Sequence, residues 1–166
     1  MVIKYKNGEE FYNKIYLYFN AIIALSLAPF GYLLLLRQSG QLLPLNLGAT
    51  QLFILVFLLL VVMSLLTFSA HINFEKAVKE MDVNLSLRKK LDVYFSLSMN
   101  KYLSFLLVGM LGVAGLYTTA NSLFIVAYII SVMLLSFKRP TLDDIINHLK
   151  MSAEEEKILI DKTEIK

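Results

Sequence analysis

The sequence predicts an all-α integral membrane protein with four transmembrane helices, and two observations lead to that prediction. Of its 166 residues, 57% are hydrophobic and only 17% are charged, a far more apolar composition than that of an average soluble domain. Of its 16 Lys and Arg residues, 15 lie within residues 1–14, 71–101 and 138–166, and long apolar runs separate these stretches. Because basic residues near membrane spans are retained on the cytoplasmic side, the pattern predicts that both termini are cytoplasmic.

The predicted spans cover residues 15–36, 51–70, 102–117 and 122–137, within a transmembrane domain that extends over 1–137. The first span is long enough to cross a hydrocarbon core of ~30 Å at a rise of ~1.5 Å per residue. In its outer half, Pro29 and Gly31 predict a kink or loosened final turns. The third and fourth spans are short for such a core, so we expect Lys101 and Lys138 to extend toward the interface.

Residues 71–101 are predicted to form a cytoplasmic helical hairpin between the second and third spans. Glu75 and Lys79 have the i,i+4 spacing that stabilises a helix, and Ser86 is a candidate N-cap for the helix that leads into the third span. Two arrangements remain open. Either the hairpin stands upright, which we prefer, or two amphipathic helices lie flat and place the basic run from Arg88 on lipid phosphates.

Residues 138–166 are predicted to form a short cytoplasmic helical tail. Thr141 with Asp144, and Ser152 with Glu155, have the spacing of capping boxes. They predict one helix at about 142–150 and another at about 153–161. Two helices this short cannot form a core alone, so we expect them to pack on the hairpin, on the membrane surface or on a partner.

Two short motifs resemble segments found in a group of small, uncharacterised bacterial four-span inner-membrane proteins. They are Leu87-Arg88-Lys89-Lys90-Leu91-Asp92-Val93-Tyr94, and the tail motif Arg139-Pro140-Thr141 followed by Ile145-Ile146 and Leu149. The resemblance implies a four-span arrangement with a short acidic helical tail over most of the chain, located in the cytoplasmic (inner) membrane. It brings no known activity with it.

The chain carries no pattern that predicts a catalytic, cofactor-binding or metal-binding residue. The four predicted spans hold no Asp, Glu, Lys, Arg or His, which argues against a proton-coupled transporter in the monomer. Cysteine is absent, and His71, at the inner end of the second span, lacks the further donors that a metal or haem site needs. The only other histidine, His148, lies in the tail. We therefore expect neither an enzyme nor a bound cofactor, and no segment is basic enough to bind nucleic acid.

These observations favour a non-enzymatic accessory, assembly or interaction subunit of a membrane complex, in contact with the lipid bilayer. A protein partner is expected at the cytoplasmic face formed by 71–101 and 138–166, or through helix packing at Gly109, Gly112 and Gly115. Packing within the chain is the preferred interpretation of these glycines. The alternative function is a small oligomeric transporter or channel built around the kinked first span.

Overall fold

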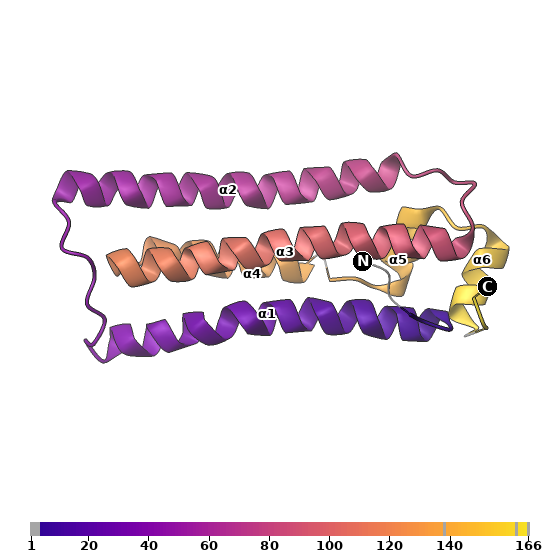
Figure 1. Cartoon of the computed structure of the whole chain (residues 1–166), viewed down its shortest axis with the longest axis horizontal. Coiled ribbons are helices and arrows are strands. Elements are labelled where there is room, and N and C mark those ends of the chain that lie inside the picture. The colour runs from indigo at the N-terminus through magenta and orange to yellow at the C-terminus, as the bar shows by residue number, and fades with distance from the viewer. Residues whose placement is uncertain (1–3, 138, 162, 166) are drawn as a thin grey trace.

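The computed structural model describes residues 4–137, 139–161 and 163–165, and the regular structure within them is entirely helical (Figure 1). Four helices form an antiparallel bundle and two short ones lie at one end of it. The helices are α1 (Gly8–Gln38), α2 (Ala49–Lys79), α3 (Leu87–Thr119), α4 (Leu123–Phe137), α5 (Leu142–Leu149) and α6 (Ala153–Ile160). The all-α part of the predicted fold is therefore confirmed.

Within the described residues, α1, α2 and α3 are each long and apolar enough to cross a membrane. The 15 residues of α4 extend only about 22 Å at the helical rise, which is less than a hydrocarbon core of ~30 Å. It meets the length requirement only together with α5, from which it is bent by 73°. The described part of the chain thus has three helices that can span, or four if this bent pair acts as one span.

The first three helices extend well beyond the predicted spans. Residues 71–79 belong to α2, whose 31 residues extend about 46 Å, so they continue the second span without a break. In the same way, α3 begins at Leu87, directly after Ser86, and continues into the third span. Ser86 is the N-cap residue, although its side chain makes no capping hydrogen bond. α1 begins at Gly8 and remains helical past Pro29.

α3 is the central helix of the bundle and packs against α1, α2 and α4. Its three glycines face these neighbours. A Cβ atom at Gly115 would overlap the ring of Phe124 on α4, and one at Gly109 would lie 2.9 Å from Cβ of Ser26 on α1. At Gly112 the nearest atom would be Cε of Met63 on α2, at 3.4 Å. The interpretation that these glycines pack within the chain is confirmed.

α1 and α4 are also joined by a polar contact inside the bundle. The hydroxyls of Ser26 and Tyr128 lie 3.1 Å apart in a buried hydrogen bond. The ring of Tyr128 also stacks on Phe30, with their centroids 3.7 Å apart. By contrast, α2 leaves large apolar side chains such as Phe53 (70% exposed) and Phe57 (62% exposed) on the outside of the bundle, as expected of a helix that faces lipid.

Candidate functional site

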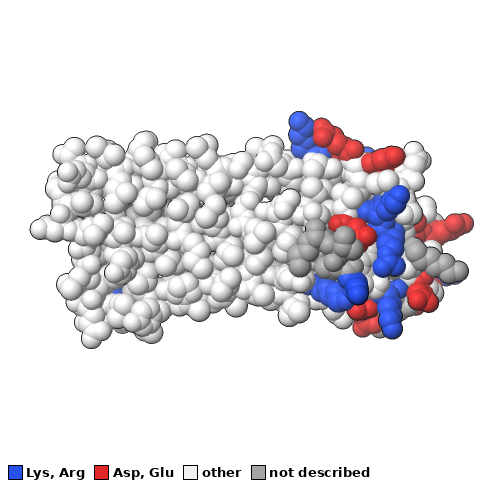
Figure 2. All heavy atoms as spheres, viewed as in Figure 1, with Lys and Arg blue, Asp and Glu red and all other residues white. Residues whose placement is uncertain are grey.

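The charged residues of the described chain gather at one end of the bundle, which we call the charged end (Figure 2). It contains the beginnings of α1 and α3, the end of α2, and the tail with α5 and α6. Arg37 lies at the opposite end and donates a hydrogen bond to the hydroxyl of Ser122 at 2.7 Å. Most of the charged side chains of the described residues therefore lie at the charged end.

The tail is part of the hydrophobic core at this end. Ile145 and Leu149 of α5 and Leu159 of α6 are each less than 5% exposed and belong to the same buried cluster as Phe74 and Phe95. The expected packing on the hairpin is found for α5, which packs on α2. α6 lies against the start of α1, outside the predicted hairpin, and is joined to α3 by an ion pair. The exposed side of the tail is consequently held at a fixed position.

Both predicted caps of the tail helices are confirmed. Thr141 is the N-cap of α5, and its hydroxyl accepts a hydrogen bond from the Asp144 amide at 3.1 Å. Ser152 is the N-cap of α6 and forms a complete capping box with Glu155, with hydrogen bonds of 3.0 and 3.3 Å. These bonds satisfy backbone N–H groups that would otherwise lack a partner at the start of each helix.

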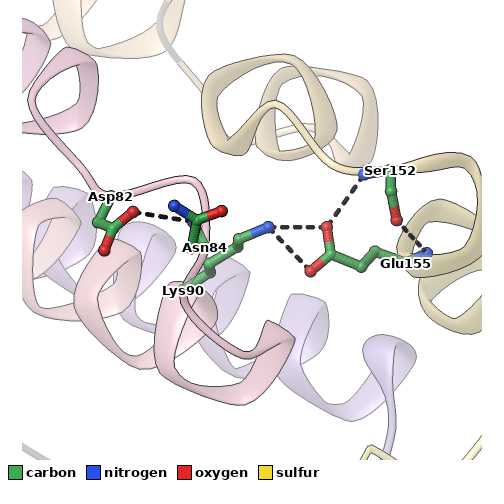
Figure 3. Close-up of polar contacts among 5 residues, drawn as sticks. All are labelled: Asp82, Asn84, Lys90, Ser152 and Glu155. Carbon is green, nitrogen blue, oxygen red and sulfur yellow. Dashed lines mark hydrogen bonds and ion pairs between the residues drawn. The ribbon is translucent and has the colours of Figure 1, made fainter.

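A buried ion pair joins α6 to the start of α3 (Figure 3). Lys90 is only 3% exposed, and its Nζ donates to both carboxylate oxygens of Glu155 at 2.8 Å. Burial raises the pKa of Glu155, but hydrogen bonds from Lys90 and from the Ser152 amide outweigh it, so this pKa lies below its ordinary value. Beside this pair, the Asp82 carboxylate accepts a hydrogen bond from the backbone N–H of Asn84 at 2.9 Å and so stabilises the turn between α2 and α3.

The N-terminal segment is tied to the same end. The Tyr5 hydroxyl donates to Asp92 at 3.0 Å, and burial together with that carboxylate raises the pKa of Tyr5, so the hydroxyl stays protonated. The amide of Ile165 donates to the carbonyl of Lys6 at 2.8 Å, which brings the two ends of the described chain together. A Cβ atom at Gly8 would overlap the backbone of Leu159, so glycine allows α6 to approach α1 closely.

A polar recess of about 170 Å³ lies between α2, α3 and α5. Aromatic side chains line it together with five polar or charged ones, which are Glu75, Lys101, Arg139, Asp144 and His148. His148 Nε2 lies 3.8 Å from Glu75 Oε1, so the two side chains pair when the imidazole is protonated. These five residues come from four separate parts of the chain, and only the folded tail brings them together.

Lys101, which we expected to extend toward the membrane interface, has a buried side chain in the structure. The side chain is 6% exposed, and its Nζ lies 4.4 Å from the centroid of the Phe74 ring. The reason is its position on α3, where Tyr94, Ser98 and Phe105, at helical spacing, are buried on the same face. Lys138, for which the same expectation was made, lies outside the described residues.

A second, apolar recess of about 150 Å³ adjoins the polar one. Its walls are mainly apolar side chains of α2, α3 and α4, and it shares Lys101 and Phe137 with the polar recess. His71 lines this apolar recess, whereas His148 lines the polar one. Among the described residues, no group of three or more His, Asp and Glu side chains is placed to hold a metal ion.

The acidic residues of α2, α3 and the turn between them do not form one group. Glu75 faces the polar recess, whereas Asp82 stabilises a turn and Asp92 accepts the hydrogen bond from Tyr5. The sequence did not identify the polar recess, because most of its members meet only through the tail. One signal was present, since Asp144 and His148 are four residues apart and therefore share a face of α5.

Comparisons with models of known protein families, with curated proteins and with solved structures give no significant match to this chain. The functional argument therefore rests on the residues and their geometry.

Proposed function

We propose that this chain is a non-enzymatic integral protein of the bacterial cytoplasmic (inner) membrane and an accessory or assembly subunit of a larger membrane complex. Both termini face the cytoplasm in this proposal, and the part of the charged end formed by 71–101 and 138–166 is the surface that contacts the partner. One observation carries the proposal: the tail packs into the core, so the charged end presents its exposed residues from a rigid scaffold. A surface of this kind suits recognition better than a mobile tail, because less conformational freedom is lost on binding.

The outward side of α6 has the composition of a partner surface. Ile160 is 52% exposed and Ile158 is 36% exposed, although both lie on the helix that buries Leu159. Exposed Glu154 and Lys157 flank them. Apolar side chains rimmed by charges of both signs are typical of surfaces that bind another protein.

The glycine face of α3 offers less support for a partner. Gly109 and Gly115 face Ser26 and Phe124 of this same chain. The surface that a helix of a partner protein would need is therefore already covered by contacts within the chain. Of the two expected partner surfaces, the charged end is the one that leaves side chains exposed.

The alternative of a small oligomeric transporter or channel has no comparable support in the described residues. The cavity beside Ser26, Gly109 and Tyr128, near the middle of the bundle, measures about 10 Å³. That is about the smallest space that holds a single water. Flux measurements on proteoliposomes decide this alternative, and substrate-dependent flux would favour it over the accessory role.

Site-specific crosslinking in cells tests the proposed function. Because the sequence contains no cysteine, each introduced cysteine is the only one in the chain. A cysteine at Lys157 on the charged end should give one discrete crosslinked product, which the charge reversal Glu154→Lys in the same chain should weaken. A cysteine at Gln41, which is exposed at the opposite end, is the control and should give no such product. If the chain stays uncrosslinked at both positions and purifies as a monomer under mild extraction, the proposal fails.

A further inference from the structure

The two adjoining recesses lie where the apolar and polar parts of three helices meet. Lys101 directly precedes the apolar run 102–117, His71 directly follows 51–70, and Arg139 follows 122–137 closely. Each of these boundaries marks the depth at which a span leaves the hydrocarbon core. The polar recess is therefore at the level of lipid headgroups, and the apolar recess is on the side of the acyl chains.

The charges of the polar recess match a ligand that carries both signs. Its two permanent cations, Lys101 and Arg139, balance its two carboxylates, Glu75 and Asp144. A phosphate is recognised by Lys and Arg, and a primary ammonium group donates hydrogen bonds to carboxylates. A purely anionic or cationic ligand would meet two charges of its own sign.

The aromatic lining favours a primary ammonium over a quaternary one. Quaternary ammonium groups are bound against the faces of aromatic rings. Here Nζ of Lys101 already lies against the ring of Phe74, 4.4 Å from its centroid. The rings of this aromatic group also contact one another, because Phe74 packs edge to face with both Tyr94 and His148. Each carboxylate still has one oxygen for the ligand cation, since Glu75 lies near His148 through Oε1 and Asp144 accepts a hydrogen bond from the Thr141 hydroxyl through Oδ2.

We propose that these two recesses together bind one phospholipid with an ethanolamine headgroup. Its phosphate contacts Lys101 and Arg139, its ammonium group contacts Glu75 and Asp144, and the beginning of one acyl chain lies in the apolar recess. Lys101 and Phe137 border both recesses and therefore lie at the junction of headgroup and chain. The proposal requires only that the chain spans a membrane, and it does not depend on a protein partner.

Native mass spectrometry of the delipidated full chain in mild detergent tests this proposal, with dioleoyl phosphatidylethanolamine, phosphatidylglycerol and phosphatidylcholine as probes. One equivalent of phosphatidylethanolamine should bind at least tenfold more tightly than either of the other lipids. Arg139→Gln should weaken this binding about tenfold, since one hydrogen bond to a charged group is lost. Arg139 is exposed and its guanidinium lies 6.0 Å from the centroid of the Tyr16 ring, so its replacement should disturb little of the fold, whereas Lys101→Met is avoided because that side chain is buried.

A variant whose lipid preference changes distinguishes an altered binding site from a general loss of structure. The double variant Glu75→Gln with Asp144→Asn gives the recess a formal charge of +2 and should prefer phosphatidylglycerol. The matched control, Lys76→Gln with Asp143→Asn, changes the exposed neighbours outside the recess and should keep the original order. Equal binding of all three lipids, a preference of the unchanged protein for phosphatidylglycerol, or an unaltered order in the double variant would overturn the proposal.

Soluble phosphoethanolamine distinguishes a lipid site from a site for the headgroup alone. It should compete at least tenfold more weakly than the intact lipid, since it leaves the apolar recess unfilled. Competition as strong as that of the lipid would overturn the assignment of the apolar recess. This outcome is independent of the crosslinking test, so the failure of either proposal is recognisable by itself.

Discussion

The ion pair between Lys90 and Glu155 should control whether α6 stays attached to the bundle. At 2.8 Å, two unit charges attract by about 6 kcal/mol when the effective dielectric constant is ~20. Most of this attraction is offset by the desolvation of a lysine that is 3% exposed and a glutamate that is 19% exposed. The net value of the pair is therefore small, but the removal of one partner leaves the other charge buried and uncompensated.

Glu155→Gln isolates this effect, because glutamine keeps the shape and the capping-box geometry of glutamate. Its amide oxygen still accepts one hydrogen bond from Lys90, so we expect a loss of about 2 kcal/mol and not the ~3–5 kcal/mol of a fully broken buried pair. That loss raises the population with α6 detached about 30-fold. Glu154→Gln is the matched control. It removes an exposed acid from the same helical turn and should change that population no more than about fivefold.

Hydrogen exchange of the α6 amides, measured by mass spectrometry in lipid nanodiscs, reports this population directly. Lys90→Met combined with Glu155→Gln removes the uncompensated charge and should recover part of the protection lost in Glu155→Gln alone. Equal exchange in Glu155→Gln and Glu154→Gln would refute the argument that the pair holds the tail. A double variant that exchanges faster than Glu155→Gln would refute the argument that a buried charge is the cause.

Three further predictions concern the same end of the molecule. Gly8→Ala should speed exchange in α6 at least tenfold, because the new Cβ overlaps the backbone of that helix, whereas Gly31→Ala on the same helix meets no atom within 4 Å and should have no effect. Protection of α6 should be constant from pH 7 to about pH 5 and should fall at lower pH. The pKa of Glu155 is lower in the folded chain than in the detached tail. The ionised carboxylate therefore stabilises the attached tail above the ordinary carboxyl pKa, and this stabilisation is lost as Glu155 is protonated. Glu155→Gln should remove this pH dependence of α6 protection. A cysteine at Asp82 in intact cells should resist an impermeant maleimide that labels one at Gln41, and the reverse pattern would contradict the proposed orientation.

The sequence predicts the helices of this chain well because its signals are local. Thr141 and Ser152 begin the tail helices at the predicted residues, since a capping hydrogen bond depends on residues only three positions apart. The fourth span has the predicted bounds for a similar reason, because its apolar run ends in charged residues. Its ability to cross a membrane by itself does not follow, since 15 helical residues are shorter than the hydrocarbon core.

The polar recess could not be predicted in the same way, because its geometry depends on contacts distant in sequence. His148 meets Glu75 only after α5 has packed on α2, and no local pattern encodes that docking. The burial of Lys90 was missed for the same reason. Its partner, Glu155, lies 65 residues further along the chain, where the local sequence indicates only its place in the capping box with Ser152.

The two buried lysines of α3 also bear on how basic residues set the orientation. Lys90 and Lys101 belong to the basic stretch that predicts a cytoplasmic location for 71–101, yet both are less than 10% exposed in the folded chain. Retention of basic residues acts while the spans insert, before the helices pack against one another. Charges that are later buried therefore still count toward the orientation. In the proposed orientation, the same side chains act first on topology and afterwards in the folded charged end, where Lys90 pairs with Glu155 and Lys101 lines the proposed lipid site.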